Sequence, residues 1–225
     1  MTSHVQKGIK QQTPSIGKRF LLIILIFCIQ MIYIPTSFRT AGGFEPKLPI
    51  DIFPIWAVWV LPYVLCYLLW LCSFLWAIFK MDDQLFRTLI AAFLLTCTAS
   101  ASMFIFFPTY VSQATIEGSD IFASLLRYIH ENWGRYDAFP SGHIYITTLL
   151  ALFYSRWYPR YKFLWILILI IVSLSTLFTG QHYVADIFGG LLVAFMGYHF
   201  GLRWARFALP HNRPAKTRLL LPPST

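Results

Sequence analysis

The sequence predicts an all-α, polytopic membrane protein: a bundle of six transmembrane helices with one additional interfacial helix. Three observations lead to this class. Of the 225 residues, 57% are hydrophobic and only 12% are charged, whereas soluble domains carry about 25% charged residues. The apolar residues gather in runs close to the roughly 20 residues that cross a bilayer core. Most of the basic residues stand between these runs rather than within them.

Short polar or basic connections separate the six expected spans. The spans fall at about residues 20–38, 54–79, 89–107, 143–158, 163–178 and 183–204. We expect the short fourth span to include part of the membrane interface. The six-helix domain then covers residues 18–207. Residues 1–17 form a cytoplasmic tail before it, and residues 208–225 form a basic cytoplasmic tail after it.

The longest connection, residues 108–140, contains one further helix. Ile121, Leu125 and Ile129 recur at helical spacing, and polar residues occupy the opposite side. An amphipathic segment of this kind is typical of a helix that lies in the membrane interface. Ser119 and Asp120 supply a suitable N-terminal cap for it.

The distribution of basic residues sets the orientation of the chain. An even number of spans places both termini on one side, and 14 of the 18 Lys and Arg residues fall on that side. The remaining four are Arg39, Lys47, Arg127 and Arg135. By the positive-inside rule, both termini are cytoplasmic. Membrane topology also accounts for the net charge of +9, and we expect no nucleic-acid partner, because no soluble basic domain is present.

Two polar motifs stand at the starts of the fourth and sixth spans, and the expected topology returns both to the outer face. The later motif runs from Gln181 to Asp186. His182 and Asp186 are four residues apart, so they lie on one face of the helix. A carboxylate that hydrogen-bonds one imidazole nitrogen fixes the tautomer and leaves the other nitrogen free as a nucleophile.

The earlier motif is Pro140-Ser141-Gly142-His143. A helix start binds anions through its free backbone N–H groups, and Gly142 allows a phosphate to approach the backbone closely. The Ser141 hydroxyl can donate a further hydrogen bond. His143 can protonate a leaving alcohol as a general acid.

Simpler interpretations exist for the same residues. His182 and Asp186 could be a structural pair that holds helices together, and Ser141 could be only a helix cap. The two histidines and Asp186 could hold zinc. No further ligand spacing supports a metal, however, and we expect none.

The sequence Phe139-Pro140-Ser141-Gly142-His143, followed about 40 residues later by Gln181-His182-Tyr183-Val184-Ala185-Asp186, resembles the type 2 phosphatidic acid phosphatase (PAP2) superfamily. The resemblance implies a six-helix membrane fold, an outward-facing site and a mechanism without a metal or other cofactor. It also implies a role for each site residue: His182 as nucleophile, Asp186 as its partner, His143 as acid, and Ser141 and Gly142 as phosphate ligands.

The chain departs from the family pattern at its cations. The first family motif, a lysine followed seven residues on by Arg-Pro, is missing, and Ser175-Thr176 stands where the third motif usually begins Ser-Arg. Arg127 and Arg135 are the candidates that we name to replace these cations, with Arg39 and Lys47 as further options. The third motif is more similar to the inositolphosphotransferase and sphingomyelin-synthase-like branch.

The sequence therefore predicts an integral membrane lipid phosphatase that hydrolyses a lipid phosphate or pyrophosphate monoester through a phosphohistidine at the outer face. Its expected partners are the lipid phosphate substrate and the bilayer. One alternative is a lipid phosphotransferase, passing an inositolphosphoryl or phosphocholine group to a lipid hydroxyl. A second alternative is an inactive transporter or scaffold. The oligomeric state is not predicted.

Overall fold

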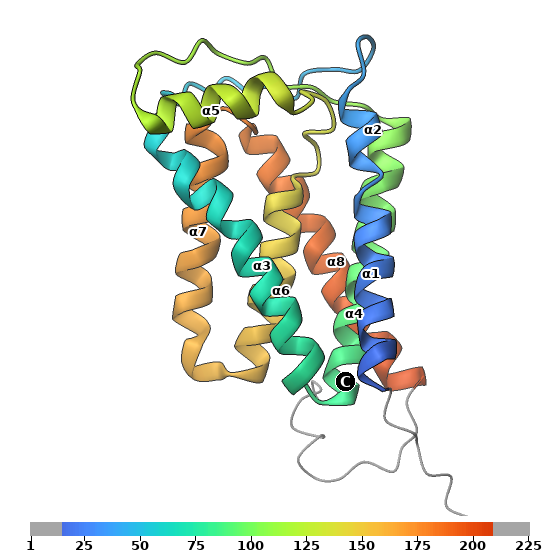
Figure 1. Cartoon of the computed structure of the whole chain (residues 1–225). Coiled ribbons are helices and arrows are strands. Elements are labelled where there is room, and N and C mark those ends of the chain that lie inside the picture. The colour runs from blue at the N-terminus through green and yellow to red at the C-terminus, as the bar shows by residue number, and fades with distance from the viewer. Residues whose placement is uncertain (1–14, 209–225) are drawn as a thin grey trace, which may run out of the picture.

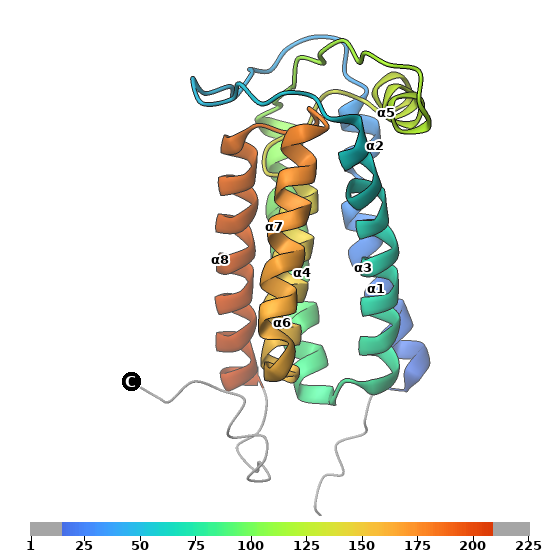
Figure 2. The same cartoon turned by 90° about the vertical axis from the view of Figure 1, so that its left-hand side faces the viewer.

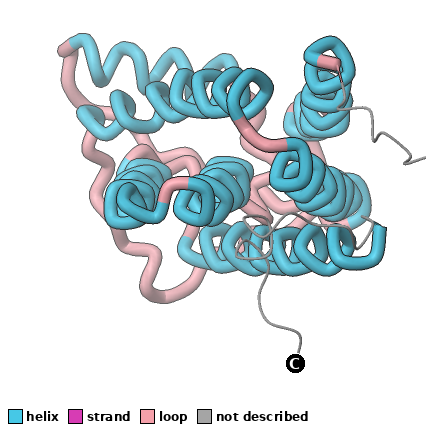
Figure 3. The backbone as a smooth tube through the Cα atoms, turned by 90° about the horizontal axis from the view of Figure 1, so that it is seen from below, coloured by secondary structure: helices cyan, strands magenta, loops and turns pink. Residues whose placement is uncertain are grey.

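The described part of the chain forms one elongated bundle of helices (Figure 1). The computed structural model describes residues 15–208. Most of the two predicted tails, residues 1–14 and 209–225, therefore lies outside the described residues. Seen along its axis from the end that carries the first and last described residues, the bundle consists of helices and loops alone (Figure 3).

Eight α-helices follow one another along the described chain. They are α1 (Ile16–Gln30), α2 (Tyr33–Ser37), α3 (Val60–Lys80), α4 (Asp83–Phe106), α5 (Ile121–Asn132), α6 (Gly142–Trp157), α7 (Lys162–Phe178) and α8 (Val184–Ala208). Two 3₁₀ turns, η1 (Ala57–Trp59) and η2 (Pro159–Tyr161), lead into α3 and α7.

Five stretches within the described residues are long and apolar enough to cross a membrane. They are Ile16–Ser37, Ala57–Lys80, Asp83–Phe106, Pro159–Phe178 and Val184–Phe207. The chain is therefore a multi-pass integral membrane protein with an all-helical fold, as predicted. The remaining predicted span corresponds to α6, which has 16 residues, and a count of six spans stays a prediction.

Helix α6 is the central helix of the bundle. Tyr145, Leu149 and Phe153 are among its fully buried side chains, and the helix packs against both α7 and α8. A helix that is buried on most of its surface is enclosed by protein rather than by lipid. Its first residues, which include the earlier of the two polar motifs, are therefore held in the interior of the protein.

The end of the bundle that carries both described chain ends is tied together by Arg19. Its guanidinium group donates hydrogen bonds to the backbone carbonyls of Ala77, Ile78 and Met81 and forms an ion pair with Asp83. The orphan carbonyls at the end of α3 are thereby satisfied. An arginine that contributes to the charge asymmetry thus also joins α1 to the α3–α4 turn.

Helix α4 begins six residues before the predicted third span. The Asp82 side chain accepts a hydrogen bond from the backbone N–H of Leu85 at 2.9 Å, and Asp83 occupies the first turn. A capping aspartate and a first-turn acid both stabilise a helix start. These polar residues therefore extend the helix beyond its apolar run.

The helix predicted in the 108–140 connection is confirmed as α5, which lies across the other end of the bundle (Figures 1 and 2). Its position in the membrane interface stays a prediction. Asp120 caps it, as predicted, by accepting two backbone N–H groups of the first turn. Leu126 and Ile129 on its inner face pack with Val60 and Tyr63 of α3. Helix α5 thus covers the end of the bundle at which α6 and α8 begin.

Helix α8 packs very closely against α4. A Cβ atom at Gly197 would lie 2.0 Å from the Thr96 hydroxyl oxygen, and this hydroxyl donates to the carbonyl of Val193 at 3.3 Å. Small residues allow membrane helices to approach at this distance. This contact fixes the position of α8 along its axis and therefore also the position of its first turn.

Candidate active site

The starts of α6 and α8 lie side by side, which brings the two polar motifs together. The backbone N–H of Ser141 donates to the carbonyl of Asp186 at 3.1 Å. A Cβ atom at Gly190 would lie only 2.9 Å from the Ser141 carbonyl oxygen and 2.8 Å from the Cβ of Ile144. Glycine at this position therefore permits the direct contact of the two helix starts.

His182 and Asp186 form a close pair. The His182 Nδ1 atom lies 3.4 Å from Asp186 Oδ2, and the side chains are 9% and 0% exposed. Asp186 Oδ2 also accepts the backbone N–H of Tyr183 at 2.8 Å, as a first-turn acid does in a capping box. This hydrogen bond fixes the position of the carboxylate beside the imidazole. Since Nδ1 faces the carboxylate, Nε2 is the nitrogen on the opposite side of the ring.

The turn before α8 holds His182 at the backbone as well. The N–H groups of Gln181 and His182 both donate to the carbonyl of Thr176, at 3.1 and 3.2 Å. Gly180 has a φ of +67°, in the left-handed region that glycine adopts without strain. The chain can therefore reverse its direction in a tight turn, and His182 lies at the end of this turn, just before α8.

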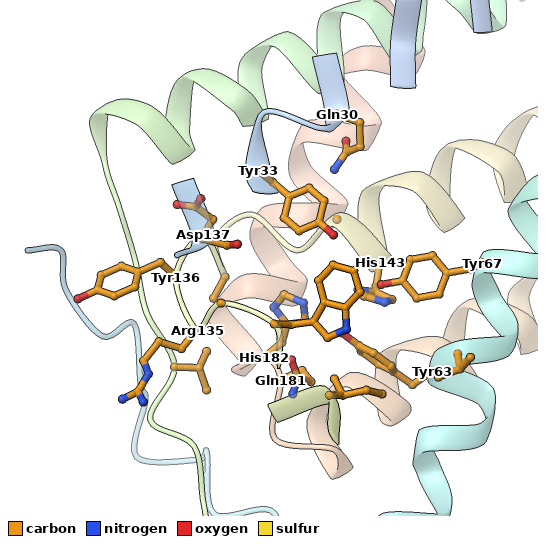
Figure 4. Close-up of a pocket in the computed structure, with 18 of the residues that line it drawn as sticks. Gln30, Tyr33, Tyr63, Tyr67, Arg135, Tyr136, Asp137, His143, Gln181 and His182 are labelled. Carbon is orange, nitrogen blue, oxygen red and sulfur yellow. The ribbon is translucent and has the colours of Figure 1, made fainter. Parts of the chain in front are cut away.

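His143 faces His182 from the first turn of α6 (Figure 4). The two ring centroids are 5.8 Å apart. The His143 ring stacks on Tyr63 at 4.2 Å and contacts the rings of Tyr67 and Trp70 at 5.3 and 5.5 Å. Its Nε2 atom is buried and has no hydrogen-bond partner among the described residues. Aromatic packing alone thus orients this imidazole.

Ser141 is the N-cap residue of α6, but its hydroxyl makes no capping hydrogen bond. The residue is fully buried, and its Oγ atom lacks a partner within residues 15–208. A buried hydroxyl without a partner is costly, which distinguishes Ser141 from an ordinary cap. At Gly142, an added Cβ atom would meet Gln30 and Tyr145 at ordinary contact distances of 3.6 Å.

A cavity of about 490 Å³ adjoins the two histidines. Residues of α1, α2, α3, α5 and α6 and of the 180–182 turn line it, and many of them are aromatic. The aromatic lining residues include Tyr33, Tyr63, Tyr67, Trp70, Tyr128 and Trp133. Figure 4 shows the two histidines among these rings. A mostly apolar cavity with a few convergent polar groups is the usual form of a ligand site.

The candidate cations are placed differently from one another. Arg135 is the only Lys or Arg among the described residues that line the cavity, and its guanidinium group points away from the two histidines (Figure 4). Arg127 lies outside the cavity lining, because its guanidinium group donates to the carbonyls of Ile116 and Gly118 at 3.1 and 2.8 Å. The structure therefore does not bring Arg127 to the two histidines.

The other basic options are also held elsewhere. Arg39 donates to the carbonyl of Ile105 at 3.2 Å, and Lys47 Nζ lies 6.0 Å from the centre of the Tyr183 ring. At the position of the missing family arginine, Thr176 is fully buried and its hydroxyl donates to a carbonyl of its own helix. No cation reaches the histidine pair within the described residues.

Carboxylates of the loop before α3, which the sequence did not single out, brace the start of α8. Asp51 accepts the backbone N–H of Val184 at 2.8 Å and that of Leu48 at 2.7 Å. Glu45 accepts the hydroxyl of Tyr183, and this hydrogen bond is the main reason that the pKa of Glu45 is lowered. Nothing local in the sequence marks these acids as neighbours of α8, since Tyr183 and Val184 are more than 130 residues away from them.

Asp137 is a further acid that sequence reasoning missed. It lines the cavity, is only 7% exposed and has a left-handed backbone with a φ of 64°. Neither carboxyl oxygen has a hydrogen-bond partner among the described residues, and burial raises the pKa of this carboxyl group to about 6. Its only signal in the sequence is its position four residues before Ser141.

A metal site finds no donor set in the described part of the chain. No group of three or more His, Cys, Asp or Glu side chains there is arranged to hold a metal ion. The zinc alternative raised by the two histidines and Asp186 therefore lacks support from the arrangement of donors.

The fold is that of a multi-pass membrane protein in which two polar helix starts meet at one end of an apolar bundle. A family model described as the PAP2 superfamily matches residues 53–200. This is more than half of the chain, so the chain belongs to the PAP2 superfamily. A search of curated proteins finds no match. The similarity to the inositolphosphotransferase and sphingomyelin-synthase-like branch stays a prediction.

Proposed function

We propose that the chain is an integral membrane enzyme that cleaves a phosphate ester of a lipid through a phosphohistidine on His182, with water as the final acceptor. Membership of the PAP2 superfamily and the membrane helices support a membrane phosphatase-like function. The observation that carries the finer proposal is the pair formed by His182 and the fully buried Asp186, beside the cavity and opposite His143.

The first step uses the nitrogen of His182 that faces away from Asp186. Asp186 keeps the proton on Nδ1, so Nε2 carries the lone pair that attacks phosphorus. The N–P bond forms while the bond from phosphorus to the lipid oxygen breaks. Protonated His143 gives its proton to the departing oxygen. The result is a phosphohistidine and a free lipid alcohol.

The second step reverses these roles. Neutral His143 takes a proton from water as the water oxygen attacks phosphorus, and the N–P bond breaks. His182 is regenerated, and the phosphate leaves. Each histidine returns to its starting protonation state, so the cycle is a hydrolysis that requires no cofactor.

Three residues that line the cavity support a lipid as the substrate. Met31, at the α1–α2 junction, and Val64 and Tyr67, on α3, line the cavity, and each is more than a third exposed on the outer surface of the bundle. These residues belong to stretches that can span the membrane. A lipid can thus pass from the bilayer to the histidines between α1 and α3 while its chains remain in an apolar medium.

The distribution of charge supports an outward-facing site. The first turn of α1 and the last turn of α8 lie at the end of the bundle opposite to α5 (Figure 1). The sequence places 14 of the 18 basic residues on the side of the termini, which favours a cytoplasmic position for that end. The histidine pair, at the other end, then faces periplasm, lumen or exterior.

A second candidate function is lipid phosphotransfer, in which a lipid hydroxyl replaces water in the second step. Two observations favour this candidate: no cation within residues 15–208 reaches the histidines, and Ser175-Thr176 is more similar to the transferase-like branch. Release of inorganic phosphate from a lipid phosphate supports hydrolysis. Formation of a new phospholipid with an added acceptor, without free phosphate, supports transfer instead.

The test is a release assay on the purified full-length protein with a panel of lipid phosphates, with and without EDTA. We expect His182→Ala to lower the rate by at least about 10⁴-fold, and EDTA to have no effect. His199→Ala, an exposed histidine farther along α8, is the matched control and should retain full activity. Equal release by His182→Ala and wild type would contradict His182 as the nucleophile, and no cleavage of any ester by the wild type would favour the inactive scaffold or transporter interpretation.

A further inference from the structure

The phosphoryl group in the proposed reaction needs ligands, and the chain lacks the Lys and Arg residues that the family motifs would supply. A buried phosphate is stable only where hydrogen bonds or opposite charges replace its water shell. Arg135 points away from the histidines (Figure 4). The groups that remain beside His143 and His182 are neutral donors, and two of them belong to glutamines, Gln30 and Gln181.

Gln30 is a polar residue at the end of the apolar helix α1, and a polar group at membrane depth is a candidate functional residue. The hydroxyl of Tyr145, which is fully buried, donates to Gln30 Oε1 at 2.5 Å. With Oε1 turned to the tyrosine hydroxyl, the amide keeps both of its N–H donors for another partner. The Nε2 group then lies on the other side of the carboxamide, 3.6 Å from the Cβ position of Gly142, and is directed toward the cavity (Figure 4).

Gln181 presents a second amide from the opposite wall. Its Nε2 atom is buried without a hydrogen-bond partner among the described residues, and the residue lines the cavity next to His182. Its backbone is fixed by the hydrogen bond to Thr176. A buried amide NH₂ group whose two N–H donors have no hydrogen-bond partner costs free energy. A ligand that accepts hydrogen bonds from Gln181 would therefore be stabilised.

Ser141 completes the set. Its buried hydroxyl also lacks a partner within the described chain, and it stands at the start of α6, where the backbone N–H groups of the first turn favour an anion. Gln30, Gln181 and Ser141 come from three separate elements. Both glutamines line the cavity, and Ser141 is the N-cap of the helix that carries His143.

We propose that the carboxamides of Gln30 and Gln181, together with the Ser141 hydroxyl, bind the non-bridging phosphoryl oxygens in place of cations, and that the site consequently selects a singly charged phosphodiester over a doubly charged phosphomonoester. This inference rests on the proposed phosphohistidine function and narrows its substrate class. Neutral donors stabilise one negative charge adequately, whereas a second buried charge requires an opposite charge.

Asp137 strengthens the selection of a phosphodiester over a phosphomonoester. It is the only Asp or Glu among the described residues that line the cavity, and neither Thr36 nor the positive charge of Arg39 outweighs the burial that raises the pKa of its carboxyl group. When ionised, it repels a dianion more than a monoanion. The negative charge of Asp137 therefore disfavours the monoester, which is the substrate form that the sequence alone suggested.

The test compares two esters that differ by one ethyl group: phosphatidate, a monoester, and phosphatidylethanol, a diester with the same acyl chains. Both esters release diacylglycerol when the bond from phosphorus to the lipid oxygen breaks. The rate of diacylglycerol release is measured for each ester with the full-length protein in mixed micelles. We expect wild type to cleave phosphatidylethanol at least about tenfold faster than phosphatidate at equal concentration.

Two kinds of variant then test the glutamines. Gln30→Leu and Gln181→Leu should each lower kcat/KM for phosphatidylethanol by about 10- to 100-fold, the effect of a lost hydrogen bond to a charged group. Gln181→Lys should shift the ratio of the two rates toward phosphatidate by at least about tenfold, since it supplies the missing cation. The ratio is independent of the folded fraction, because both esters are measured on one sample.

Gln84→Leu is the matched control, since Gln84 lies in the first turn of α4 at the other end of the bundle; its rate ratio should equal that of wild type. Preference for phosphatidate by wild type, or a ratio that Gln181→Lys leaves unchanged, would overturn the inference while His182-dependent cleavage keeps the proposed function. Cleavage of neither ester, or cleavage that survives His182→Ala, would overturn both.

Discussion

Two buried polar pairs stand at opposite ends of the same bundle, and they differ in how completely they are satisfied. Arg19 and Asp83 form an ion pair, and Arg19 also donates to three backbone carbonyls. His182 and Asp186 are at least as buried, yet Nδ1 of the histidine and Oδ1 of the aspartate make no hydrogen bond to a described residue.

The contrast separates a structural pair from a functional one. A fully satisfied buried pair holds helices in place, and its loss is felt as instability. A pair with unused donors and acceptors beside a cavity carries a cost that only a ligand or a reaction relieves. We therefore expect changes at the Arg19 end to act on folding and changes at the His182 end to act on turnover.

The largest effect after loss of His182 itself is expected at His143. His143→Gln removes the proton donor for the leaving group while keeping a polar side chain of similar length. We expect kcat to fall by about 10²- to 10⁴-fold, with a thermal midpoint close to that of wild type. A rate within threefold of wild type would show that another group protonates the departing oxygen. Steady-state kinetics and thermal unfolding in detergent provide the two measurements.

At the other end of the bundle, Arg19→Leu should act in the opposite way. It leaves three carbonyls and Asp83 without their donor, and we expect a loss of about 2–4 kcal/mol of stability, with kcat per folded molecule unchanged. The double variant Arg19→Leu/Asp83→Leu should recover part of this loss, because no unpaired charge remains. A fall in kcat without a fall in the unfolding midpoint would contradict the division between the two pairs.

The smallest effect is a pH-dependent one at Asp137. Its pKa is raised to about 6, so the folded protein binds this proton more tightly than the unfolded chain does. Stability therefore falls as pH rises from about 4 to about 6. Asp137→Asn, which suits a left-handed backbone, should be more stable than wild type by about 1 kcal/mol at pH 8.

The gain from Asp137→Asn should largely disappear at pH 4, where the wild-type carboxyl group is protonated in the folded protein and about half protonated in the unfolded chain. Thermal unfolding midpoints of both proteins at pH 4 and pH 8 supply the comparison. A variant that is less stable than wild type at pH 8 would mean that Asp137 has a partner that the folded chain provides.

The helices and the meeting of the two motifs could be predicted because both follow from local pattern. Apolar runs of near-bilayer length define the helices, and an even number of runs between two motifs returns them to one end. Asp120 was recognised as a cap for the same reason, since its partners are the N–H groups of its own helix. Local chemistry of this kind is visible in the sequence.

The rest of the site depends on tertiary contacts that no local pattern encodes. Gln30 is oriented by Tyr145, 115 residues away, and Asp51 accepts from Val184, 133 residues away. Arg127 is a candidate in the sequence to replace the missing family cations, but nearby loop carbonyls accept hydrogen bonds from its guanidinium group. Sequence reasoning thus supplied the histidines and Asp186, and the packing of other elements supplied the groups around them.

The central claim is that His182 becomes covalently phosphorylated, and trapping the intermediate tests it most directly. The full-length protein is mixed with a lipid phosphate ester, quenched in alkali within the first turnover, digested and analysed by mass spectrometry. We expect an acid-labile, alkali-stable phosphoryl group on His182 that is absent from His182→Ala. Turnover accompanied by a phosphoryl group on any other residue, or by none in the first turnover, would contradict the account.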